Sequence, residues 1–153
     1  MANVEVVNSG FNDYFRTIQK RVHELLDPIS QQQLWTKPYF YGNSIGNLIL
    51  HLTGNLNYYI GARMGETGYV RDRDLEFRDS GKAKEELLRN FDQAIEVVVQ
   101  TVSNQSATDW AAPYMAERTQ MHDRFSMVLN CAAHANHHIG QIIYLQRELL
   151  GAS

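Results

Sequence analysis

The residues best suited to chemistry are three of the six histidines: His51, His134 and His138. His134 and His138 are four residues apart, a spacing that places their Cβ atoms about 5–6 Å apart on one face of a helix. Two imidazoles so placed can bind one metal ion at Zn–N distances of about 2.0–2.1 Å. His51 lies far upstream among apolar neighbours, and a buried imidazole needs a partner for each ring nitrogen. We therefore predict a metal site formed by these three residues. The alternatives are a hydrogen-bonded core histidine at position 51 and a coincidental downstream pair.

The remaining histidines and the single cysteine are weaker candidates. His137 points about 100° away from His138 around a helix, which predicts a solvent-facing or interface position. His23 and His122 have the surroundings of surface or loop residues. Cys131 precedes His134 by three residues and would lie on nearly the same face. It is a possible fourth ligand that would close a tetrahedral site, or a small buried hydrophobic residue.

These candidates must be positioned by helices, because apolar residues recur at steps of three and four along most of the chain. Four long helices are expected, at about 6–26, 45–64, 82–102 and 123–150. A short helical turn is expected over 30–35. The proposed N-terminal caps are Ser30, Ser44 and Ser80, and the proposed stops are Asp27-Pro28 and Gly151.

Two long connections, 65–80 and 103–121, separate the later helices. We expect the first to be a solvated segment, with Arg or Asp at each position from 71 to 74. No segment alternates as a strand would, so the prediction is an all-α protein, a single domain over 1–153. Its architecture would be a four-helix bundle with long crossover connections. Gly46, Gly54 and Gly61 interrupt the second helix and are candidates for close contacts.

Composition limits the class of protein and its partners. The chain has 153 residues with 14 basic and 17 acidic side chains, a formal charge of −3. This balance lacks the basic excess of nucleic-acid binders. One cysteine cannot form an internal disulfide. The N-terminal Met1–Glu5 has no basic segment followed by an apolar run, no stretch approaches the roughly 18 apolar residues of a membrane span, and no helix has a strongly basic polar face. We expect a soluble, cytoplasmic protein that does not bind membranes.

Two sequence elements resemble the DinB superfamily. One is His51 in Asn47-Leu48-Ile49-Leu50-His51-Leu52, and the other is His134-x-x-x-His138-x-Gly140-Gln141-Ile142. Trp35, after the first helix, also fits the superfamily's pattern. Many members have arginine where this chain has Ile139, a departure that suggests a different branch with a different substrate.

The resemblance implies an up-up-down-down four-helix bundle, often a homodimer, with zinc or nickel on three histidines. By position these are His51, His134 and His138. Some members resemble transferases or isomerases that use bacillithiol, mycothiol or glutathione. The implied partner is therefore a small-molecule substrate, such as a low-molecular-weight thiol.

Three functions remain open from the sequence. A metal on three neutral imidazoles keeps open positions that could bind a thiol, which indicates metal-assisted thiol transfer. A metal-dependent hydrolase would instead need a nearby general base, for which Glu24, Asp92 and Glu96 are formally available. A non-enzymatic, metal-stabilised binding or stress-response module is the third. Residues that could line a pocket beside His51 are Asn55, Tyr58 and Tyr59.

Overall fold

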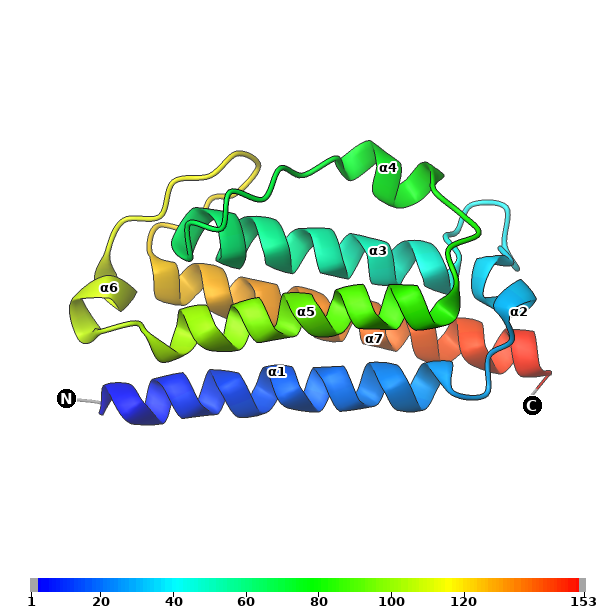
Figure 1. Ribbon diagram of the computed structural model, residues 1–153, viewed down its shortest axis with the longest axis horizontal. Coiled ribbons are helices and arrows are strands. Elements are labelled where there is room, and N and C mark those ends of the chain that lie inside the picture. Colours follow the sequence, from blue (N-terminus) through cyan, green and yellow to red (C-terminus); the bar gives the residue numbers. More distant parts are fainter. Residues whose placement is uncertain (1–2, 152–153) are drawn as a thin grey trace.

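The computed structural model describes residues 3–151 and is all-helical, with no strand in that range. Four long helices lie side by side: α1 (Val4–Leu26), α3 (Ile45–Leu56), α5 (Lys84–Ser103) and α7 (Arg124–Leu150) (Figure 1). Both α1 and α3 pack against α5 and α7. The short helices α2 (Gln31–Trp35), α4 (Arg73–Arg78) and α6 (Ala107–Ala111) lie in the connections. The expected all-α fold is confirmed.

The directions of the long helices follow from these connections. In Figure 1, α1 and α7 run one way while α3 and α5 run the opposite way. The connection that contains α4 is a crossover, because it carries the chain back along the molecule to the side where α3 begins (Figure 1). The connection that contains α6 stays at one end of the molecule (Figure 1). The order along the chain is up, down, down, up, because only one of the two long connections crosses over, and the expected up-up-down-down order is not confirmed.

Most predicted helix ends are observed. The Ser44 hydroxyl accepts a hydrogen bond from the Asn47 backbone N–H at 3.1 Å, and Ser30 forms a capping box with Gln33. Gly151 ends α7 with a φ of 65°, in the left-handed region that glycine adopts without strain.

The prediction that Ser80 caps the third helix is wrong. The capping position is Ala83, whose side chain makes no hydrogen bond. The side chain of Gln31, in α2, caps the helix from a distance, since its Oε1 accepts from the Lys84 backbone N–H at 2.9 Å. A contact across 53 positions leaves no local signal in the sequence.

The connections hold structure that the apolar pattern did not predict. The segment expected to be solvated contains α4, which packs along α3. Asn47 holds it there, because its Nδ2 donates to the backbone oxygens of Glu76 and Asp79 at 3.0 and 2.9 Å. The expected helix over 45–64 is also divided, with α3 passing into a π-helix, η1 (Asn57–Ala62).

A single core unites the long helices. Buried apolar residues of α1, α3, α5 and α7 form one cluster, in which Phe15, Ile49, Phe91 and Val128 are fully buried. Gly46 allows a close approach, since a Cβ there would lie 2.6 Å from the Trp35 ring. Within residues 3–151 no helix is both long and apolar enough to cross a membrane. Met1 and Ala2, part of the segment considered for a leader, lie outside the described residues.

Candidate metal centre

The three predicted histidines meet between α3 and α7. His51 projects from α3, and His134 and His138 project from successive turns of α7. The Nε2 atom of His134 lies 3.2 Å from Nε2 of His51 and 3.0 Å from Nε2 of His138. One ligand atom from each residue fits within a group no more than 4.8 Å across, so the three side chains could hold a metal ion.

Two of these rings have their tautomer set by a neighbour. The Nδ1 of His51 lies 2.8 Å from Oε2 of Glu76, and the Nδ1 of His138 lies 2.6 Å from Oε1 of Gln141. Because both partners are acceptors, each Nδ1 carries the proton and donates. The Nε2 atoms of His51 and His138 are therefore bare lone pairs that face His134.

Hydrogen bonds alone cannot satisfy all three Nε2 atoms, whereas a cation bound between them could accept all three lone pairs. His134 Nε2 can donate one hydrogen at most, yet it faces two acceptors at hydrogen-bonding distance. At least one pair of lone pairs is therefore opposed. Tetrahedral coordination with Zn–N bonds of about 2.0–2.1 Å places ligand nitrogens about 3.3 Å apart, close to both observed separations. The donor set fits a divalent metal.

Glu76 anchors this set from behind. It is a buried carboxylate on α4, and Arg71 donates to it through Nε at 2.7 Å and Nη2 at 2.9 Å. Burial alone would raise the pKa of Glu76, but the hydrogen bonds from His51 and Arg71 outweigh burial and lower that pKa. Glu76 thus stays ionised, orients the His51 ring and makes it a better donor to a metal.

His134 and His138 have lowered pKa values, which favours their neutral forms. Burial is the largest cause that lowers the pKa of His134 to about 3, and the neighbouring imidazoles contribute to the same shift. Burial is also the largest cause that lowers the pKa of His138. Neutral imidazole is the form that binds metals. The Nδ1 of His134 is buried and has no partner among the described residues, so its ring lacks the support that the other two have.

The weaker sequence candidates lie elsewhere. His137 is exposed on α7, and His122 is exposed just before that helix. His23 bonds to Asp92 at 2.8 Å between α1 and α5. Cys131 is buried and outside the histidine group, and burial raises the pKa of its thiol to about 12. It has the position expected of a small buried hydrophobic residue.

The carboxylates considered as general bases do not contact His51, His134 or His138. Asp92 faces α1 through His23, and Glu96 pairs with Arg16, with 2.9 Å between Nη2 and Oε2. Glu24 is exposed beside Lys20. None of the three lines a cavity that reaches His51 or His134.

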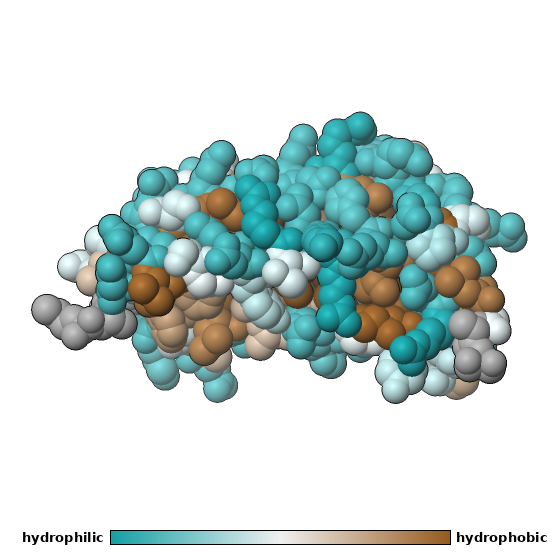
Figure 2. Space-filling view, turned by 90° about the horizontal axis from the view of Figure 1, so that it is seen from below, coloured by the Kyte–Doolittle hydropathy of each residue, from teal (hydrophilic) through white to brown (hydrophobic). Residues whose placement is uncertain are grey.

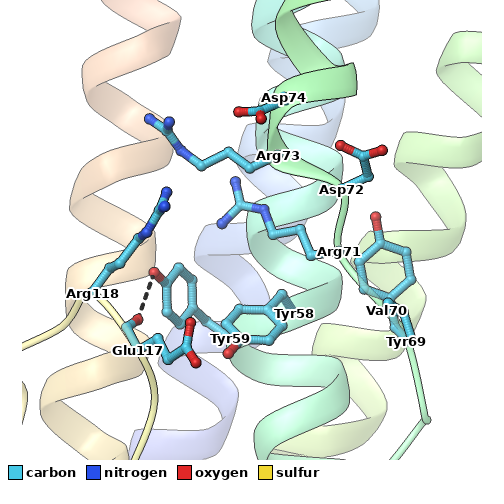
Figure 3. Close-up of a pocket in the computed structure, with 10 residues that line it drawn as sticks. All are labelled: Tyr58, Tyr59, Tyr69, Val70, Arg71, Asp72, Arg73, Asp74, Glu117 and Arg118. Carbon is cyan, nitrogen blue, oxygen red and sulfur yellow. Dashed lines mark hydrogen bonds between the residues drawn. The ribbon is translucent and has the colours of Figure 1, made fainter.

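A cavity of about 340 Å³ reaches the site, and we call it the inner cavity. His51 and His134 line it together with Asn55 and Tyr59, two of the residues considered from sequence. The third, Tyr58, lines a neighbouring cavity of about 680 Å³, the outer cavity (Figure 3). Other residues of the inner cavity are Arg71, Arg73, Arg118, Thr119, Met127 and Asn130.

Sequence reasoning missed Glu76 and Arg71, because they belong to the connection expected to be solvated. One signal was present. A Cβ at Gly54 would lie 2.0 Å from Oε1 of Glu76, so the glycine inside α3 makes room for the carboxylate. Gln141 was in the quoted motif but without a role.

The fold and this site define an all-helical protein with a partly buried histidine cluster. The model of the family described as "Protein of unknown function (DUF1572)" matches residues 4–153, and the chain belongs to that family. A crystal structure of a conserved protein from Enterococcus faecalis has a similar fold, with a TM-score of 0.77. It is 15% identical, over 94% of this chain and 96% of that one. A search of curated proteins found no match.

Proposed function

We propose that this chain is a DinB-like four-helix-bundle metalloenzyme that binds one zinc or nickel ion at His51, His134 and His138. The observation that carries the proposal is the meeting of three Nε2 atoms. Glu76 and Gln141 bind the Nδ1 atoms of His51 and His138, which leaves an unprotonated Nε2 on each of these two rings. Such a partly buried arrangement is unfavourable without a cation and favourable with one.

We propose thiol transfer to a small electrophile as the reaction. A bound metal would act as a Lewis acid that favours the thiolate over the thiol. The sulfur forms a bond to the electrophilic carbon, the leaving group departs with its electron pair, and the thiol proton passes to solvent. The protein contributes a dry, shaped cavity and the fixed imidazoles.

The surroundings favour a thiol nucleophile over hydrolysis. A hydrolase would use a general base within about 3 Å of its water. No described Asp or Glu lines the inner cavity, and Glu76 is engaged by His51 and Arg71 behind the site. A thiol that has lost its proton needs no such base. The inner cavity also gives small molecules a route to His51 and His134, which supports an enzyme over a metal-stabilised binding module.

Metal content tests the first half of the proposal. Protein purified without nickel affinity should carry about one zinc or nickel per chain after dialysis at neutral pH, measured by elemental analysis. His138→Ala should lose the metal, while His137→Ala, on the exposed side of the same helix, should keep it. Equal metal content in the two variants would contradict the ligand assignment.

Product analysis tests the second half. The metal-loaded protein is incubated with an electrophilic bimane and with bacillithiol, mycothiol or glutathione, and the thioether is measured by mass spectrometry. At least one thiol should give conjugate faster with wild type than with His138→Ala. If wild type and His138→Ala gave conjugate at equal rates with each of the three thiols, thiol transfer would be rejected, while the metal site would not be affected by this result.

A further inference from the structure

Three arginines gather where the inner and outer cavities meet. Arg71 precedes α4, Arg73 begins α4, and Arg118 comes from the connection before α7. Figure 3 shows their guanidinium groups directed into the same space, on one side of the Tyr59 ring. All three line both cavities, so this positive group lies beside His51 and His134.

Among the residues that the structure describes, only one of these arginines has a carboxylate partner. Arg71 is neutralised by Glu76. Within residues 3–151, neither Arg73 nor Arg118 lies within 4.0 Å of a carboxylate oxygen, and neither donates a hydrogen bond. The Arg73 guanidinium carbon is 5.3 Å from the Phe77 ring centroid, a contact that orients the side chain. Two guanidinium groups are thus available to a ligand.

The nearby acids do not enter the inner cavity. Asp72, Asp74 and Glu117 line only the outer cavity. Asp72 caps α4 by accepting from the Leu75 backbone N–H at 3.0 Å, and Figure 3 shows its carboxylate turned away from the guanidinium groups. The charge that lines the inner cavity is therefore purely positive.

Asn55 gives an independent sign of a ligand. The residue is 7% exposed, its Oδ1 is buried without a hydrogen-bond partner among the described residues, and it lines the inner cavity one helical turn after His51. A buried amide without partners is unfavourable unless a ligand completes its hydrogen bonds. The amide can donate to an oxygen or accept from a hydroxyl or amine.

We propose that the inner cavity is a subsite for an anionic group of the substrate, a carboxylate or a phosphate, bound by Arg73 and Arg118. Asn55 hydrogen-bonds a polar atom next to that group. Planar guanidinium groups match both anions with paired N–H donors. The inference rests on the proposed function in one respect: the reacting atom of the same molecule would reach the three histidines.

Direct binding of small anions tests the subsite. Malonate and inorganic phosphate are titrated by calorimetry into metal-free and zinc-loaded protein at constant ionic strength in chloride. At least one anion should bind to both forms. The Arg73→Gln/Arg118→Gln double variant should bind it at least tenfold more weakly. Tighter binding of malonate would assign a carboxylate, and tighter binding of phosphate would assign a phosphate.

A matched control removes the same charge elsewhere. Arg21→Gln/Arg89→Gln changes two exposed arginines that line neither cavity, and it should bind the anion like wild type. Equal binding by the two double variants, or no binding to wild type in either form, would overturn the subsite. If the wild-type protein bound the anion but did not bind zinc, the proposed function alone would be rejected.

Discussion

The Nδ1 of His51 and the Oε2 of Glu76 lie 2.8 Å apart, although 25 residues separate them in the chain. The histidine is on α3 and the glutamate on α4, a helix of only six residues. Arg71 holds the other side of the carboxylate. A short, otherwise marginal helix is thus fixed to the bundle at the point where it supports the candidate metal centre.

Replacing Glu76 tests its support of the ligand. Glu76→Gln removes the negative charge that fixes the His51 proton on Nδ1 and leaves Arg71 without its ion-pair partner. We expect metal affinity to fall about 10- to 100-fold, the usual effect of losing a hydrogen-bond partner of a ligating histidine. Competition with a chromogenic chelator measures the change. Glu86→Gln, on α5 beside Lys82, is the control and should bind metal like wild type.

Gly54→Ala tests the space that the carboxylate occupies. Alanine favours a helix by about 1 kcal/mol over glycine, but the new Cβ would lie 2.0 Å from Glu76 Oε1. Since Arg71 holds that oxygen and His51 holds the other oxygen of the same carboxylate, the crowding should destabilise the protein by about 1–3 kcal/mol and weaken metal binding. Denaturant unfolding measures the first effect and chelator competition the second.

Gly10→Ala is the matched control, because a Cβ at Gly10 meets nothing within 4 Å on α1. It should stabilise the protein by about 0.5–1 kcal/mol and leave metal binding unchanged. If both glycine variants gained stability equally, the proposed packing of Glu76 against α3 would be wrong.

The stability of the metal-free protein should depend on the protonation of His134. Its pKa is lowered to about 3 in the fold, while an unfolded histidine titrates near about 6.5. Between these values the unfolded chain binds a proton that the folded chain does not. Stability should therefore fall as the pH decreases from about 6.5 towards 3. In chelator-treated protein, His134→Gln should show a shallower decline in unfolding free energy between pH 7 and 5. An unchanged slope would count against a depressed pKa.

The lowered pKa values also revise an expectation from sequence. Free imidazoles predict that metal binding weakens below roughly pH 6.5. Because burial lowers the pKa of His134 and His138, protons compete less well for these two ligands. We expect the bound metal to survive dialysis at a pH somewhat below 6.5, as measured by elemental analysis. Full release already at pH 6.5 would disagree with this expectation.

We propose that the protein forms a homodimer through exposed apolar side chains on α1 and α7. Phe125 and Leu129, 41% and 52% exposed, lie one turn apart on α7, and Phe11 of α1 contacts the Phe125 ring. Apolar patches are visible on this side of the molecule (Figure 2). Leu129→Glu should give a monomer in light scattering, whereas Phe40→Glu, in the loop after α2, should leave a dimer. A monomeric wild type would refute the proposal.

The sequence by itself determined the helical class and the placing of His134 and His138 on one face of α7. Apolar residues at helical spacing mark the long helices, and an i,i+4 interval places His134 and His138 on one face wherever the helix lies. Local hydrogen bonds made Ser30, Ser44 and Gly151 predictable as helix ends for the same reason: the signal and the structure lie within a few residues of each other.

Tertiary structure decided the rest. Gln31 caps α5, Glu76 supports His51, and Arg73 and Arg118 come together from separate connections. Each of these relationships joins residues that are distant in sequence, and its energy arises only when the long helices have packed. A run of charged residues such as 71–74 has the composition of a solvated loop, and only the return path of the chain over α3 brings it to the histidines.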